Sequence, residues 1–119
     1  MFIIHPDEVT GSIAELKPGA GTIGSADDDV DILGNASYEG CTKVVIHSDS
    51  FASGFFDLRT GMAGDILQKF SNYRMRLAIV GDISHLKSRS WRDFIRESNR
   101  GKMVCFVPTV EEAISALRK

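Results

Sequence analysis

Residues 43–47 read Lys-Val-Val-Ile-His, with three β-branched residues at the centre of a short apolar run. Such runs are typical of strands buried on both faces of a parallel sheet. Similar runs follow at residues 76–82 and 103–107, and shorter candidates precede at residues 2–4 and 12–16. Between these apolar runs, the apolar residues recur with the spacing of a helix. The alternation predicts an α/β fold with a mainly parallel sheet of four or five strands, right-handed crossovers and helices packed on the sheet.

Helices are expected where apolar residues recur three and four positions apart. The clearest pattern begins at Thr60 or Gly61 and ends near Tyr73. A hydroxyl at a helix start can accept a hydrogen bond from a backbone amide of the first turn, which marks the beginning of a helix. The other helix starts predicted in this way are Ser25, Ser90 and Thr109.

The composition describes one globular domain spanning residues 1–119. The chain is 43% hydrophobic and 25% charged, which suffices to form a single core. No apolar window is long enough to span a membrane, and the first residues do not resemble a secretion signal. Cys41 and Cys105 fit neither a disulfide framework nor a metal-binding spacing. A cytoplasmic location is therefore expected.

The charges are distributed unevenly along the chain. Residues 1–57 carry ten acidic and two basic residues, whereas residues 58–119 carry six acidic and twelve basic residues. In an interleaved domain we expect the two halves to mix in space. Nucleic-acid binding is not expected, because the pI is about 5.9 and no basic run is interleaved with aromatics. Charge-driven association into a homodimer is a third hypothesis beside the two functional ones given below.

Polar residues follow the predicted strands at the edge where ligands bind in parallel sheets. Candidate ligand-binding residues there are His47, Asp49, Asp82 and Ser84. Asp57, Thr60 and His85 are expected nearby. The alternative interpretation is a purely structural one, in which these residues cap helices or make turns. We assign no catalytic residue, metal site or cofactor, because the three histidines are far apart in sequence and lack ligand partners.

A glycine motif precedes the first long helix. Residues 19–24 read Gly-Ala-Gly-Thr-Ile-Gly, which matches a dinucleotide-binding pattern. Three aspartates at residues 27–29 would repel a pyrophosphate at the helix start. We therefore interpret the motif as a flexible turn.

The segment from residue 55 to residue 64 is the main candidate for a partner-binding surface. Its candidate residues are Phe55, Asp57, Arg59, Thr60 and Gly61. Thr60 stands where a helix-capping hydroxyl belongs, and it is also a candidate phosphoacceptor, since an added phosphate would lie at the positive end of a helix. The phenylalanines at positions 51, 55 and 56 are expected to be exposed in the loop.

The chain resembles the sulfate-transporter-and-anti-sigma-antagonist (STAS) domain. In that family a buried strand leads to an Asp-Ser-Ser-Gly-hydrophobic-Gly turn, and a partner kinase phosphorylates the second serine. Here Leu58 and Arg59 stand in place of the serine step, and threonine replaces serine. The matching parts are the strands at residues 44–46, 77–80 and 104–107, the helix at residues 112–117, and Asp57, Thr60, Gly61 and Gly64 of the turn.

A second resemblance is closer and covers most of the chain. Residues 56–61 and 67–82 look like a bacterial family known only as a domain of unknown function, the 4180 family. This resemblance implies a family but no activity.

Two functional hypotheses follow. The first is a non-enzymatic cytoplasmic regulatory module that binds an unknown protein partner through residues 55–64 in the manner of a STAS-like switch. Burial of the three loop phenylalanines would remove its main support. The alternative is a small-molecule or nucleotide-binding domain, including an enzyme, that uses the strand-end loops. A cavity of about 300 Å³ or more at that edge would favour the alternative.

Overall fold

The computed structural model describes residues 2–18, 23–24, 26–84, 86 and 88–119. Three sequence features are affected by the gaps. Most of the glycine motif, the predicted cap Ser25 and the candidate His85 lie outside the described residues.

The described residues form one five-stranded mixed sheet in which strand order follows chain order. The first strand pairs antiparallel with the second, and the other neighbouring pairs are parallel. The sheet is therefore mainly but not purely parallel. Its strands are β1 (Phe2–His5), β2 (Ser12–Leu16), β3 (Cys41–His47), β4 (Arg76–Val80) and β5 (Val104–Val107).

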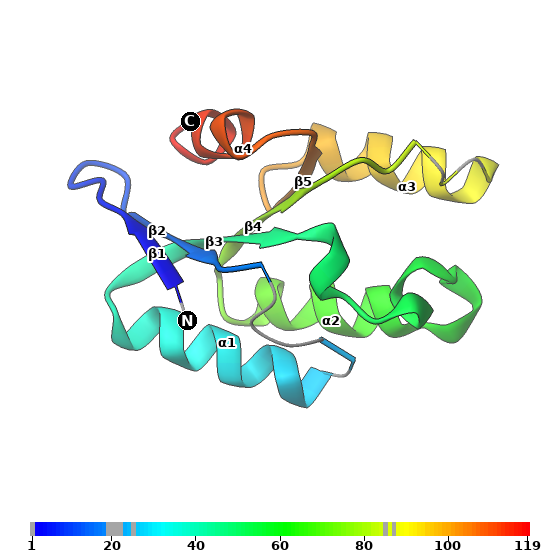
Figure 1. The fold of residues 1–119 in the computed structure, drawn as a ribbon, viewed down its shortest axis with the longest axis horizontal. Helices are drawn as coiled ribbons and strands as arrows, with labels where there is room; N and C mark the ends of the chain where they lie inside the picture. Colours follow the sequence, from blue (N-terminus) through cyan, green and yellow to red (C-terminus); the bar gives the residue numbers. More distant parts are fainter. Residues whose placement is uncertain (1, 19–22, 25, 85, 87) are drawn as a thin grey trace.

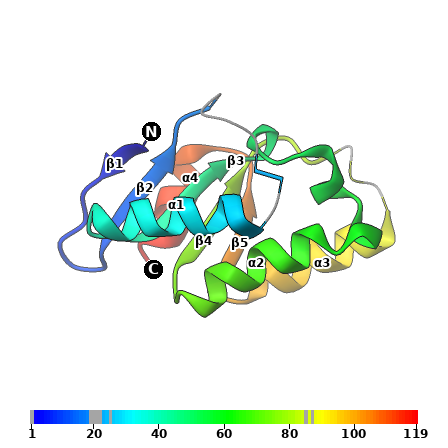
Figure 2. The same ribbon diagram turned by 90° about the horizontal axis from the view of Figure 1, so that it is seen from below.

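Four α-helices lie in the described part of the chain: α1 (Ala26–Tyr38), α2 (Met62–Asn72), α3 (Arg89–Arg100) and α4 (Val110–Leu117). Each crossover steps to the next strand in the same direction, so right-handed connections put α1, α2 and α3 on one face. Figure 1 shows α1 and α2 on one side of the sheet and α4 on the other. Figure 2 looks onto the side where α1 and α2 lie next to each other.

Two apolar clusters hold these layers together. The larger one joins α1, α2 and α3 to the sheet and includes Leu33, Phe70 and Trp91. The smaller one lies under α4 and includes Val45 and Leu117. Trp91 of α3 is 3% exposed and therefore belongs to the core.

The two ends of α4 are held by polar side chains. At its start, the Thr109 hydroxyl accepts a hydrogen bond from the Glu112 amide at 3.2 Å, which confirms the predicted cap. At its end, the Arg76 guanidinium donates to the carbonyls of Ala116 and Leu117 at 3.2 and 3.1 Å. Arg76 lies on β4, so this cation fastens the last helix to the sheet by donating to carbonyls at the negative end of that helix.

The start of α3 differs from the prediction, and of the two starts predicted for α2 the structure has Gly61 rather than Thr60 as the N-cap. The N-cap of α3 is Ser88 rather than Ser90, because the Ser88 hydroxyl accepts from the Trp91 amide at 3.2 Å. Helix α2 starts at Met62, and its N-cap is Gly61 with a φ of 75°. Thr60 instead ends a short 3-10 turn over Leu58–Thr60. Local spacing does not distinguish between adjacent capping residues, because the choice depends on the backbone angle of each.

The two halves of the chain, which differ in charge, build different strands of the sheet but remain in contact, since Arg118 lies 3.7 Å from Asp7. Because strand order follows chain order, the acidic first half builds β1, β2, α1 and β3, while the basic second half builds α2, β4, α3, β5 and α4. The strands of the two halves therefore lie toward opposite ends of the sheet, while the helices α1 and α2 and the Arg118–Asp7 ion pair connect the halves.

Candidate functional site

The turn from Asp57 to Gly61 is held by one ion pair. Arg59 donates from Nε and a terminal guanidinium nitrogen to the two Asp57 carboxylate oxygens, each at 3.0 Å. The Arg59 amide donates to the same carboxylate at 3.0 Å. These hydrogen bonds lower the pKa of Asp57. The Arg59 side chain is 91% exposed, so the turn presents an ordered pair of charges to solvent.

Thr60 is exposed, and its hydroxyl is engaged by three backbone groups. The hydroxyl lies 2.8 Å from the Gly54 carbonyl and 2.9 Å from the Asp57 carbonyl, to which it can donate. It accepts from the Met62 amide at 3.1 Å. The hydroxyl thus satisfies an amide of the first turn of α2 from one position before the cap. It also joins the turn to the preceding loop.

The prediction that Phe51, Phe55 and Phe56 are exposed is wrong. Phe51 and Phe55 are 5% and 0% exposed, and Phe56 is half-buried. Phe55 stacks on Phe51 with ring centroids 4.1 Å apart. The Trp91 indole nitrogen donates to the Phe56 carbonyl at 2.6 Å, which fastens the loop to α3. The three rings pack against the helices of the larger apolar cluster, and this tertiary contact is what buries them.

A cavity of about 360 Å³ separates the charged turn from the start of α3. One wall is the segment 56–59 and the other is the beginning of α3. It combines buried aromatic surface with the exposed ion pair, and it is lined by Phe56, Asp57, Leu58, Arg59, Ser88, Ser90 and Trp91.

The four strand-end candidates are only partly brought together. Asp82 accepts a hydrogen bond from the Ser84 amide at 2.9 Å, and both residues line a cavity of about 410 Å³ beside Pro108. His47 does not line this cavity and instead contacts Glu15. Asp49 is exposed in the first 3-10 turn after β3.

Sequence reasoning missed a carboxylate that lies between two histidines. Glu15 is 7% exposed, and its two oxygens lie 2.9 Å from the Nε2 atoms of His5 and His47. Burial raises the Glu15 pKa, but the hydrogen bonds with His47 and His5 outweigh it and leave the pKa lowered. A carboxylate inside an apolar strand was a signal for such a partner. Which side chains become the partners of Glu15 depends on the pairing of β1, β2 and β3.

Each imidazole Nε2 that faces Glu15 lies within hydrogen-bond distance of a carboxylate oxygen and can donate to it. Among the described residues, no three histidine, cysteine or acidic side chains are arranged to hold a metal ion.

The comparison with protein families gives a clear result. A family model described as a domain of unknown function (DUF4180) matches residues 9–117. The chain belongs to the DUF4180 family. Comparisons with curated proteins and with solved structures found no match. In the described part of this DUF4180 chain, no helix has both the length and the apolar composition needed to cross a membrane.

Proposed function

We propose that this DUF4180 chain is a non-enzymatic regulatory module that binds a protein partner through the charged turn and the cavity beside α3. The carrying observation is the cavity of about 360 Å³ between segment 56–59 and the start of α3. Burial of the loop phenylalanines removes the exposed-aromatic argument for this surface. The support comes instead from the ordered turn and the cavity next to it.

The composition of this surface suits a protein partner. Interfaces commonly place apolar or aromatic surface at the centre and charged groups at the rim, with tryptophan and arginine contributing strongly. Here Trp91 lies at the cavity, and Arg59 extends from its border with 91% of its side chain exposed. The Asp57 carboxylate holds the guanidinium in place, so less side-chain entropy is lost on binding.

The STAS-like part of the proposal concerns Thr60. Phosphorylation would remove the hydroxyl hydrogen and bring phosphate oxygens next to the carbonyls of Gly54 and Asp57. Oxygen lone pairs would repel one another, so the turn would have to separate from the preceding loop. The wall of the cavity formed by segment 56–59 would change with it, which gives a physical route from modification to partner release.

The test is site-specific crosslinking in cells. A photo-crosslinking amino acid at position 59 is compared with one at position 111, which is exposed on α4 across the sheet. The proposal expects one protein to be crosslinked from position 59 and not from position 111. It also expects Thr60→Glu, but not Thr60→Ser, to reduce that crosslink. Equal crosslinking from both positions, or none from either, would contradict the proposal.

A second candidate function is small-molecule binding at the ends of β4 and β5. The cavity of about 410 Å³ there exceeds the size set out for this alternative, and Asp82 and Ser84 line it. The test is a metabolite screen that measures the midpoint of thermal unfolding. A true ligand raises the midpoint for the native chain and for Ser115→Tyr on α4, but not for Ser84→Tyr, which fills the cavity. A rise that survives in Ser84→Tyr excludes this site.

A further inference from the structure

Strand β1 leaves one edge of the sheet open. It pairs only with β2 among the described strands, so the backbone groups on its other side face outward. Natural proteins usually protect such an edge with a lysine, a proline or a bulge. The four residues Phe2–His5 contain neither lysine nor proline, and their pairing with β2 is regular. The edge is therefore competent to accept another strand.

Exposed apolar side chains gather around this edge. Five large apolar side chains are exposed in the described part of the chain, and four of them belong to β1, to the turn after it or to the end of α1. Ile3 shares the α4 side of the sheet with Glu15, and Ile4 lies on the opposite side with Ala14. The four are Ile3, Ile4, Val9 and Tyr38, with exposed fractions of 41%, 37%, 92% and 90%.

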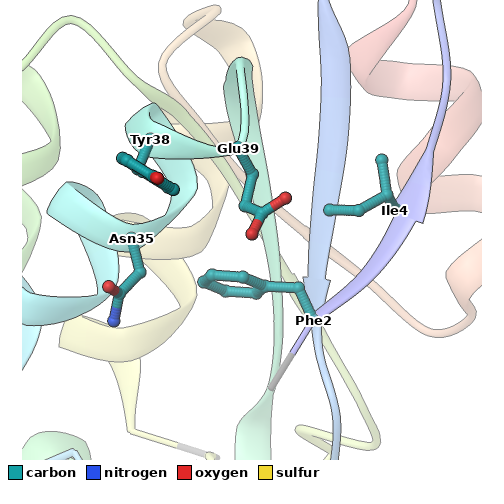
Figure 3. A pocket seen from close by; sticks show the side chains of 5 residues that line it. All are labelled: Phe2, Ile4, Asn35, Tyr38 and Glu39. Carbon is teal, nitrogen blue, oxygen red and sulfur yellow. The ribbon is translucent and has the colours of Figure 1, made fainter.

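A cavity of about 380 Å³ runs alongside the edge strand on its α1 side. Figure 3 shows Phe2 and Ile4 extending from β1, with the Glu39 carboxylate lying between Ile4 and Tyr38. Asn35 completes the lining. A side chain entering this cavity would meet apolar surface from Phe2, Ile4 and Tyr38, and a negative charge at the rim.

The charge around the edge decides the kind of partner. The acidic residues described next to this edge are Glu39, which lines the cavity, and Asp7 and Glu8, which follow β1. The basic residues near Asp7 are Lys43, which is buried, and Arg118. Two copies joined through β1 would bring these acidic residues together, and like charges next to each other are unfavourable. A basic strand from another protein meets no such penalty.

We propose that the β1 edge is a docking site for a basic, extended segment of a partner protein, which adds to the sheet as a sixth strand. Backbone hydrogen bonds to β1 supply affinity, and alternate side chains supply specificity. One set of side chains enters the cavity of Phe2, Ile4 and Tyr38, where a lysine or arginine pairs with Glu39. The other set covers Ile3 on the opposite face. This site is separate from the surface of the proposed function.

The test uses a defined peptide in place of the partner. A blocked heptapeptide of alternating lysine and valine is titrated into the labelled protein, with a glutamate–valine heptapeptide as its charge-reversed control. Backbone amide signals and amide hydrogen exchange of β1 are followed by NMR. The proposal expects shifts along β1, and slower exchange at the alternate β1 amides that point away from β2, with the basic peptide only and with binding that weakens as salt is added.

Two pairs of matched variants define the site. Glu39→Lys is compared with Glu111→Lys, and Ile4→Lys with Tyr73→Lys, because each control is also exposed but lies elsewhere. The peptide Kd should rise about five- to tenfold for the first member of each pair and stay unchanged for the second. Thermal unfolding checks that all four variants fold.

Three outcomes would overturn the proposal: no change at β1, equal binding of the glutamate–valine peptide, or equal weakening by both members of a pair. A dimer of the native chain in sedimentation that is lost in Ile4→Lys would overturn it too, since a second copy would then occupy the edge. None of these results depends on crosslinking from position 59, so the two proposals fail separately.

Discussion

Asp7 illustrates how a single carboxylate connects distant parts of this chain. Its oxygens accept hydrogen bonds from the hydroxyl and the amide of Thr10 and from the amide of Val9. Lys43 on β3 and Arg118 after α4 lie 4.0 and 3.7 Å away. The Thr10 hydroxyl is the largest cause of the lowered pKa of Asp7, which falls from 3.8 to about 2.

The lowered pKa of Asp7 should make the free energy of unfolding fall at low pH. A carboxylate whose pKa is lowered by folding stabilises the native state above its unfolded pKa, and this contribution is lost as pH falls through the folded pKa. For Asp7 the loss occurs between about pH 4 and pH 2. Glu15, whose pKa is also lowered, acts in the same direction. Urea unfolding from pH 6 to pH 2.5 should show a weaker pH dependence for Asp7→Asn than for Asp49→Asn. Identical profiles for both variants would contradict this assignment.

Thr60 offers a second test at the scale of one hydroxyl. Thr60→Val removes the hydrogen bonds with the Gly54 carbonyl and the Met62 amide while keeping the shape of the side chain. We expect a loss of about 0.5–1.5 kcal/mol in the free energy of unfolding. Thr60→Ser keeps the hydroxyl and should lose much less. Urea denaturation of both variants measures the difference, and equal losses would show that the methyl group rather than the hydroxyl matters.

At the scale of elements, the start of α3 shows that two serines separated by one residue differ in role. Ser88→Ala removes the acceptor of the Trp91 amide and should destabilise the chain by about 1 kcal/mol. Ser90 lies inside the first turn of α3, so Ser90→Ala should change stability by less than about 0.5 kcal/mol. Thermal unfolding of the two variants ranks them. A larger effect at Ser90 would indicate that Ser90, the residue predicted from the sequence, is the N-cap of α3.

Two glycines in different elements should respond in opposite directions to alanine. Gly34 lies in α1 with open space around it, so Gly34→Ala should stabilise the helix by about 0.5–1 kcal/mol. Gly81 follows β4 with a φ of 149°, and an added Cβ would collide with the side chain of Ser48. Gly81→Ala should therefore destabilise the chain, as measured by urea unfolding. Stabilisation by both substitutions would argue against the close approach of Gly81 to Ser48.

At the scale of the whole molecule, strand order follows chain order, so β1 is the edge strand at one end of the sheet. Its core contacts are limited to half-buried Phe2 and the hydrogen bond between His5 and Glu15. A chain lacking residues 1–6 should still unfold in one step, with stability lowered by about 2–3 kcal/mol. Circular dichroism and Trp91 fluorescence should give coincident transitions. Separate transitions would mean that the four parallel strands do not form one cooperative unit.

Local patterns predicted much of the secondary structure. The apolar runs around Val45 and Ile79 correspond to β3 and β4, because a strand buried on both faces needs continuous apolar residues. Thr109 was predicted correctly because its cap involves only neighbours in sequence. The α3 cap and the Thr60 turn required backbone angles that residue spacing does not encode.

Less of the candidate site could be predicted from the sequence. The turn residues Asp57, Arg59 and Thr60 lie together because they are adjacent in the chain. The cavity beside them requires α3, which follows about thirty residues later. His47 lies at the end of β3, as expected, but its side chain contacts Glu15 and does not line the cavity with Asp82 and Ser84.

The sequence by itself determined the alternation of strands and helices, the main boundaries and the total of acidic and basic residues, because these depend on local spacing and composition. Only the tertiary structure decided that Phe51 and Phe55 are buried and that Glu15 lies between two histidines. Each of these outcomes depends on which strand pairs with which. That choice is made by contacts between residues far apart in the chain, and no local pattern records it.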